Sequence, residues 1–128
     1  MVKTLADKWQ NTILKYKKQC QTILEISNNI RYVGAINNYG RTLTGVIRPN
    51  LKPLLKSEEV KHEFFIISTL FSLRKNATNS LGKLDHIILK HSKVNIVIFQ
   101  KNNVTFYVSV NSKEKSLDKI IALIKKTI

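Results

Sequence analysis

The sequence predicts an α+β fold in which a five-stranded antiparallel sheet carries packed helices, in the order α-β-β-α-β-β-β-α. Three observations lead to this prediction. A β-hairpin pattern fills residues 30–49, three other segments space their apolar residues by three and four, and the region 86–111 shows strand-like runs with tight turns. A chain of 128 residues can bury most of its apolar surface in one core, so we expect a single domain over residues 1–128.

The first segment, residues 3–28, is predicted to form a helix with one apolar face. That face comprises Leu5, Trp9, Ile13, Tyr16, Cys20, Ile23 and Leu24. We expect Trp9 and Tyr16 to lie in the core and Cys20 to act as a small buried hydrophobe. A basic amphipathic helix that lies on a membrane or accepts an acidic partner is the alternative.

Residues 30–49 are predicted to form the hairpin around which the rest of the chain packs. Two β-rich runs flank Asn37-Asn38-Tyr39-Gly40, a cluster of residue types that tolerate positive φ. The following loop contains Pro49 and Pro53, which exclude both a helix interior and a central strand.

A second helix is expected over residues 57–79, with Ser57 as its N-cap and acidic residues in its first turn. Its apolar residues form two neighbouring stripes. One stripe contains Val60, Phe64, Ile67 and Phe71, and the other contains Ile66, Leu70 and Leu73. Because one sheet face cannot cover so wide an arc, part of this helix should bury against another element or another copy of the chain.

Three strands are predicted next, at residues 86–92, 94–101 and 104–111. The last alternates apolar residues such as Val104 and Phe106 with more polar ones such as Thr105. Asn102-Asn103 suits the tight turn between the second and third strands. Ser116 is expected to cap a final helix over residues 116–128.

The chain is strongly basic, with 22 Lys and Arg against 8 Asp and Glu and a net charge of +14. Two interpretations stay open: a generally basic, solvated surface that reflects composition, and a dedicated surface for polyanions such as nucleic acid. Lysine predominates, so any nucleic-acid contact should go mainly to phosphates. The residues considered for such a contact are Arg31, Arg41, Arg48, Lys15 and Lys18.

No residue pattern typical of an enzyme is present. There is no glycine-rich phosphate-binding loop, and His62, His86 and His91 lack the spacing of a metal site. We therefore expect no catalytic residues, no cofactor and no metal. With one cysteine and no apolar run long enough to span a bilayer, the chain is expected to be cytoplasmic and without a membrane span.

The hairpin Arg31 to Pro49, with Gly34, Gly40 and Gly45, and the doubly striped helix Ser57 to Asn79 resemble the roadblock family, within the profilin-like and longin-like group of folds. The amino-acid sequence of the hairpin also resembles that of small lysine-rich archaeal proteins. The roadblock resemblance implies a dimeric module that pairs through its central helix and the strand after it. It also implies a scaffold or regulator of small GTPases and motors.

Carried onto this sequence, the resemblance implies a dimer interface at Phe65, Ile66, Leu70, Leu73, Ile87 and Leu89. We therefore expect a non-enzymatic, homodimeric regulatory or scaffold module in an archaeal cytoplasm that binds a protein partner such as a small GTPase. A basic nucleic-acid-associated protein is the alternative, and a ligand-sensing pocket between sheet and helices is a third hypothesis.

Overall fold

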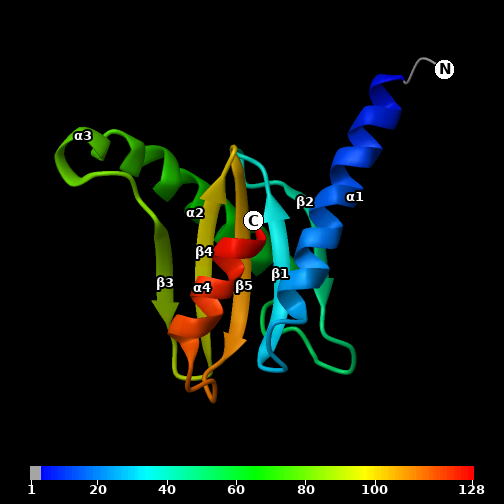
Figure 1. The fold of residues 1–128 in the computed structure, drawn as a ribbon, viewed down its shortest axis with the longest axis vertical. Helices are drawn as coiled ribbons and strands as arrows, with labels where there is room; N and C mark the ends of the chain where they lie inside the picture. The colour runs from blue at the N-terminus through cyan, green and yellow to red at the C-terminus, as the bar shows by residue number, and fades with distance from the viewer. Residues whose placement is uncertain (1–3) are drawn as a thin grey trace.

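The computed structural model describes residues 4–128 and shows the predicted order of helices and strands (Figure 1). The elements are α1 (Leu5–Leu24), β1 (Ile30–Ile36), β2 (Thr42–Ile47), α2 (Ser57–Lys75), α3 (Thr78–Leu81), β3 (His86–Lys90), β4 (Val94–Lys101), β5 (Val104–Asn111) and α4 (Leu117–Thr127). The α+β prediction is confirmed. The one-turn helix α3 is an addition, and residue 3, the expected start of the first helix, lies outside the described residues.

All five strands form one sheet in the order β2-β1-β5-β4-β3, and every neighbouring pair is antiparallel. The N-terminal hairpin and the C-terminal meander therefore meet where β1 pairs with β5, for example Val33 opposite Val108. The turn between β4 and β5 has φ values of 52° at Asn102 and 64° at Asn103, as its sequence predicts. Strands β2 and β3 are the two edges.

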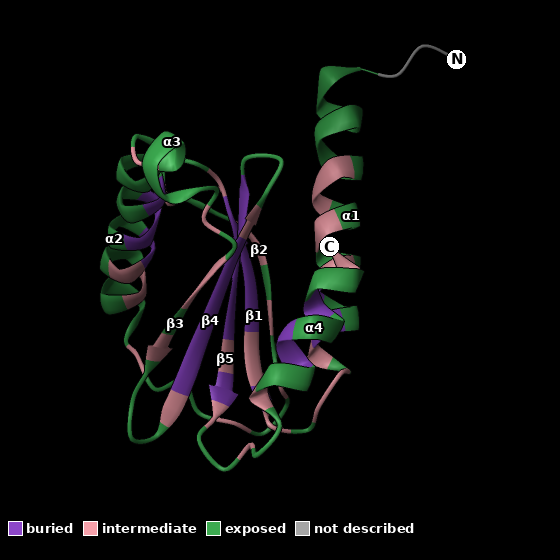
Figure 2. Ribbon diagram, turned by 60° about the vertical axis from the view of Figure 1, so that its left-hand side comes forward, coloured by how far each residue is buried: buried purple, intermediate pink, exposed green. Residues whose placement is uncertain are grey.

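Helices cover both faces of the sheet. Helices α1 and α4 lie on one face and α2 on the other (Figures 1 and 2). The core under α1 and α4 includes Val33, Phe106 and Ile124, whereas the core under α2 includes Phe64, Ile98 and Tyr107. Strand β5 serves both cores, because its alternate side chains point to opposite faces.

The N-terminal half of α1 extends beyond the sheet, which corrects the expectation that Trp9 lies in the core (Figure 2). Trp9 is 56% exposed and Leu5 is 85% exposed. Farther along the same stripe, Tyr16 packs edge-to-face on Phe106 at 6.2 Å between ring centroids, and Cys20 is fully buried. The stripe is continuous, but only its second half lies over the sheet.

Two predicted helix starts also differ in detail. Helix α2 includes Ser57, and Lys56 occupies the N-cap position, where its backbone N–H donates to the Glu59 carboxylate at 3.0 Å. Ser116 precedes α4 as expected, but its side chain makes no capping bond, and its backbone carbonyl accepts from Ile120 at 3.2 Å. The predicted helix 57–79 ends at Lys75 and is followed by α3.

Glycines allow close packing around the N-terminal hairpin. Gly34 and Gly45 lie opposite each other on β1 and β2, and a Cβ at either position would lie within 2.6 Å of the Tyr32 hydroxyl. The Tyr32 ring therefore lies across this glycine pair. In the turn, Gly40 has φ of 81° and sits against the α2 backbone, where a Cβ would lie 2.9 Å from the Phe64 carbonyl oxygen. The turn between β1 and β2 is thereby packed directly on α2.

Burial of Cys20 gives a test of the core under α1. Burial raises the pKa of the Cys20 thiol to about 12, so the folded protein holds it protonated at pH 8. We expect a disulfide reagent at pH 8 to label the native protein at least about a thousandfold more slowly than the protein in denaturant, because labelling requires unfolding. The measurement is absorbance of the released thiolate. Equal rates with and without denaturant would contradict the burial of Cys20.

The raised pKa of Cys20 also makes the free energy of unfolding depend on pH in the alkaline range. Above about pH 9 the unfolded thiol ionises while the folded thiol stays protonated, so the free energy of unfolding should fall as pH rises.

Candidate functional site

The outer face of α2 carries an exposed apolar surface. Its exposed side chains are Phe65 and Ile66, each 63% exposed, Leu73 at 62% and Leu70 at 37%. Phe64, Ile67 and Phe71, from the other stripe, are buried against the sheet. The two stripes predicted from the sequence therefore face opposite ways, and the sheet covers one of them. We call the four exposed side chains the α2 outer face.

Strand β3 borders this helix and is an edge of the sheet. Ile87 and Leu89 point to the side of the sheet that carries α2, where they are half-buried against the same core as Phe64. Ile88, on the opposite side of the strand, is 42% exposed. Within residues 4–128, β3 pairs only with β4, so its outer backbone edge is open to another strand.

Arg48, considered from the sequence as an anion contact, hydrogen-bonds to backbone carbonyls of its own chain. Its guanidinium donates to the carbonyl oxygens of Leu24 at 2.6 Å, Ser27 at 2.9 Å and Ile30 at 2.8 Å. These carbonyls belong to the last residue of α1, to the connection and to the first residue of β1, and the last carbonyls of a helix lack helical partners. Arg48 thus joins the end of α1 to the hairpin.

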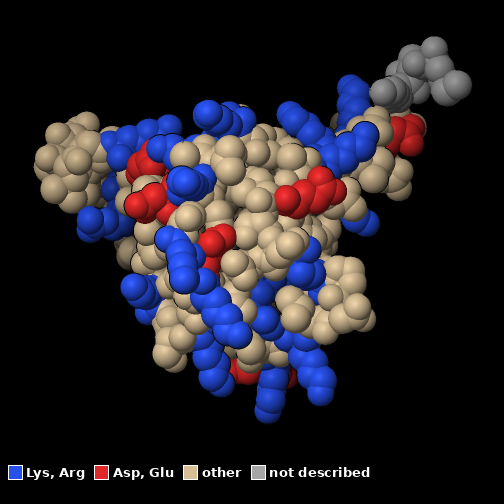
Figure 3. All heavy atoms as spheres, turned by 60° about the horizontal axis from the view of Figure 1, so that its bottom comes forward, with Lys and Arg blue, Asp and Glu red and all other residues tan. Residues whose placement is uncertain are grey.

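The other four basic candidates lie in three separate places, with Lys15 and Lys18 together on α1. Arg31 donates to the Lys52 carbonyl oxygen at 3.1 Å, Arg41 is exposed at the β1–β2 turn, and Lys15 and Lys18 are exposed on α1. Figure 3 shows basic side chains distributed over one face of the molecule, with acidic side chains between them. The structure does not bring the five candidates into one cluster.

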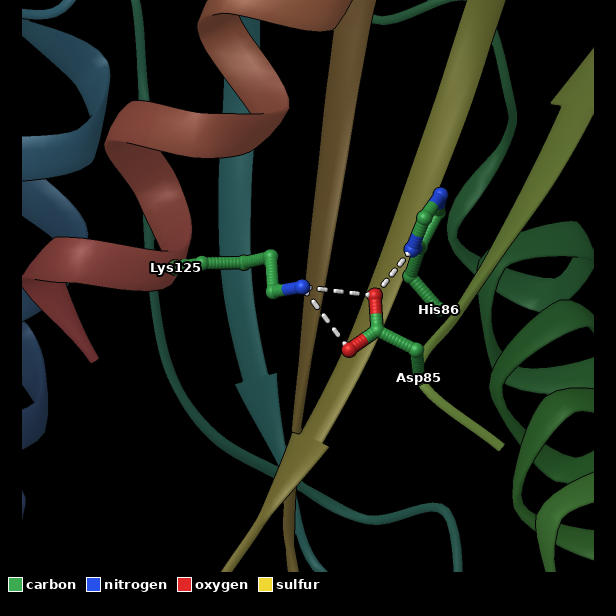
Figure 4. Close-up of polar contacts among 3 residues, drawn as sticks. All are labelled: Asp85, His86 and Lys125. Atoms are coloured by element: carbon green, nitrogen blue, oxygen red, sulfur yellow. Dashed lines mark hydrogen bonds and ion pairs between the residues drawn. The ribbon is translucent and has the colours of Figure 1, made fainter. Parts of the chain in front are cut away.

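An ion-pair group that the sequence did not reveal connects α4 to the start of β3 (Figure 4). The Asp85 carboxylate accepts from the Lys125 ammonium at 2.8 and 2.9 Å and contacts His86 Nδ1 at 2.5 Å. The hydrogen bond from Lys125, with that from His86, lowers the pKa of Asp85. Forty residues separate Asp85 from Lys125, so no local spacing could have indicated this contact. The group is exposed, and we assign it to attachment of α4.

In the part of the chain that the structure describes, no three His, Cys, Asp or Glu side chains are grouped as metal ligands would be. None of the helices between residues 4 and 128 combines the length and apolar character needed to cross a bilayer.

Comparison with known proteins identifies the fold. No protein-family model and no curated protein matches the sequence. The structure is similar to a Roadblock/LC7 domain from Streptomyces avermitilis, with a TM-score of 0.63 and 10% identity over 86% of this chain and 91% of that one. It is also similar to MglB from Myxococcus xanthus, with a TM-score of 0.68 and 10% identity over 88% of each chain.

The gliding protein MglB from Thermus thermophilus has a TM-score of 0.68 and 9% identity, over 86% of this chain and 79% of that one. At these identities the comparisons establish the fold, which is roadblock-like, as the hairpin and central helix predicted.

Proposed function

We propose that this chain is a non-catalytic, homodimeric regulatory or scaffold module that binds a protein partner such as a small GTPase. The observation that carries the proposal is the α2 outer face beside an open sheet edge. Three of its side chains are more than 60% exposed, and apolar side chains gathered on one helix face favour burial by a partner. In the roadblock fold, pairing through this helix and the following strand would give a continuous sheet across two copies.

The predicted interface residues fit this arrangement in two ways. Phe65, Ile66, Leu70 and Leu73 supply an apolar surface, while Ile87 and Leu89 anchor the edge strand to the core of their own copy. Strand pairing itself would use backbone groups of β3 and would leave those two side chains where they are. The proposed interface thus combines side chains of α2 with the backbone of β3.

Leu73→Asp should convert a dimer to a monomer, because two carboxylates would be buried in a self-complementary apolar interface. Light scattering coupled to gel filtration at micromolar concentration gives the mass directly. Leu123→Asp is the matched control, since Leu123 is 46% exposed on α4, on the opposite face of the sheet. A wild-type protein that is monomeric, or a Leu73→Asp protein that stays dimeric, would contradict the proposed interface.

The partner class needs a separate test. Wild-type, Leu73→Asp and Leu123→Asp proteins would serve as baits in extracts of the source cells, loaded with either GDP or a non-hydrolysable GTP analogue. The proposal predicts capture of a small GTPase that depends on the nucleotide. Capture that is indifferent to the nucleotide, or that contains no GTPase, would contradict this partner class.

The net charge of +14 supports a second candidate, a nucleic-acid-associated protein that makes phosphate contacts. The spread of basic side chains in Figure 3 favours binding with little sequence preference. Fluorescence anisotropy with a labelled duplex, titrated from low to physiological salt, tests it. Submicromolar binding that persists at about 0.15 M salt supports this candidate, whereas loss of binding at that salt assigns the charge to composition.

A further inference from the structure

A cavity opens between the sheet and the first turns of α2, and none of the four side chains of the α2 outer face lines it. Its volume is about 760 Å³. The sheet supplies Tyr32, Ile96, Tyr107 and Ser109 as the floor, and α2 supplies Val60 and Phe64 as one wall. A second wall comes from residues 51–55, the loop between β2 and α2. This volume lies within the range of known small-molecule sites, and apolar side chains form much of the lining.

The wall formed by residues 51–55 is hydrogen-bonded to the sheet. Arg31, on β1, donates from its guanidinium to the backbone carbonyl oxygen of Lys52 at 3.1 Å. Leu51 and Leu55 are half-buried in this loop and contribute apolar surface to the cavity. The loop is therefore positioned as one side of the cavity.

The side chains that line the cavity include four permanent cations, Arg31, Lys52, Lys61 and Lys93, and a single carboxylate, Glu63. Their charges favour an anion over a neutral or cationic molecule. The cations come from four different parts of the chain: β1, the loop before α2, the first turns of α2, and the β3–β4 turn. An anionic group at the mouth of the cavity could therefore be approached from several sides.

Tyr107 adds a polar group to the lining of the cavity. It is 5% exposed, its ring packs on Phe64 at 5.1 Å and Tyr32 at 6.1 Å between centroids, and it lines the cavity. Among residues 4–128 its hydroxyl makes no hydrogen bond. Because Tyr107 lines the cavity, its hydroxyl is a hydrogen-bond donor available to a ligand. Burial raises the pKa of Tyr107, so the hydroxyl would act as a neutral donor.

We propose that this cavity binds a small amphiphilic anion, a molecule with an aliphatic or aromatic body and a carboxylate head. The body would lie on Tyr32, Phe64 and Ile96, and the head would meet the lysines at the rim. This inference goes beyond the proposed function, since none of the four side chains of the α2 outer face lines the cavity.

Decanoate is a suitable probe, and decanol is its neutral counterpart. Isothermal titration calorimetry of the full-length protein should show decanoate binding at least tenfold more tightly than decanol. The double variant Lys61→Gln/Lys93→Gln should weaken decanoate binding at least fivefold and change decanol binding less than twofold. The matched control is Lys17→Gln/Lys119→Gln, which removes the same charge from exposed positions on α1 and α4.

Two further variants test the location. Ser109→Trp should fill the floor and abolish binding of both probes, with circular dichroism to check the fold. Tyr107→Phe keeps the packing and removes only the hydroxyl, so it should weaken decanoate binding about threefold to tenfold. Leu73→Asp should leave binding unchanged, which separates this cavity from the α2 outer face and from the proposed dimer.

The proposal would be overturned by no decanoate binding up to millimolar concentration, by equal binding of decanol and decanoate, or by binding that survives both Ser109→Trp and the lysine double variant. Loss of binding in Leu73→Asp would instead place the probe on the α2 outer face and would also overturn it.

Discussion

Phe64→Ala is expected to lower the free energy of unfolding by about 3–5 kcal/mol, the largest effect of any single substitution considered for this chain. Phe64 is 1% exposed, belongs to the core under α2 and packs edge-to-face on Tyr107. Its backbone carbonyl also lies against Gly40 in the β1–β2 turn. Truncation would therefore leave a cavity between helix and sheet at the point where the turn, α2 and β5 meet.

Phe65→Ala is the matched control, because the neighbouring phenylalanine is 63% exposed. It should change the stability of a monomer by less than about 1 kcal/mol. Both substitutions would be measured by urea denaturation in a Leu73→Asp background, so that the proposed self-association does not contribute to stability. Equal losses from the two substitutions would contradict the orientation of α2.

Arg48→Met should lower the free energy of unfolding by about 2–3 kcal/mol, because it leaves carbonyl groups at the end of α1 without their charged donor. Methionine keeps much of the apolar stem, so the change isolates the three hydrogen bonds to Leu24, Ser27 and Ile30. Arg48→Lys should recover only part of the loss, since one ammonium cannot reproduce the planar set of donors.

Arg41→Met is the control for charge, because Arg41 is exposed and its side chain makes no hydrogen bond within the described residues. We expect it to change stability by less than about 0.5 kcal/mol. Thermal or urea denaturation at fixed protein concentration compares the two arginines. If Arg48→Met cost no more than Arg41→Met, the anchoring role of Arg48 would be wrong.

Much of the proposed interface could be anticipated from α2 alone. The stripe of Val60, Phe64, Ile67 and Phe71 and the stripe of Ile66, Leu70 and Leu73 were separable in the sequence, since helical spacing determines which residues share a face. The structure shows which stripe faces the sheet. It also adds Phe65 to the exposed side, where the family resemblance had placed it.

The cavity could not be predicted in the same way. Its residues come from β1, β2, the loop before α2, α2 itself, the β3–β4 turn, β4 and β5, and several of these segments are distant from one another in sequence. Hydrophobic periodicity placed Phe64 on a helix and Tyr107 on a strand. It carries no information on whether side chains fill the space between the helix and the sheet. The position of the Tyr107 hydroxyl in the cavity lining likewise becomes apparent only once its neighbours are known.

The sequence by itself determined the elements and the faces of this protein. Spacing of apolar residues produced the helices and strands, and Asn102-Asn103 and Gly40 specified turns, because these are local properties of the backbone. Only the tertiary structure decided the role of Trp9, whose stripe runs past the end of the sheet, and of Arg48, whose acceptors lie at least 18 residues away. Burial and hydrogen bonding at these two positions depend on where distant segments end in space, and periodicity carries no information about that.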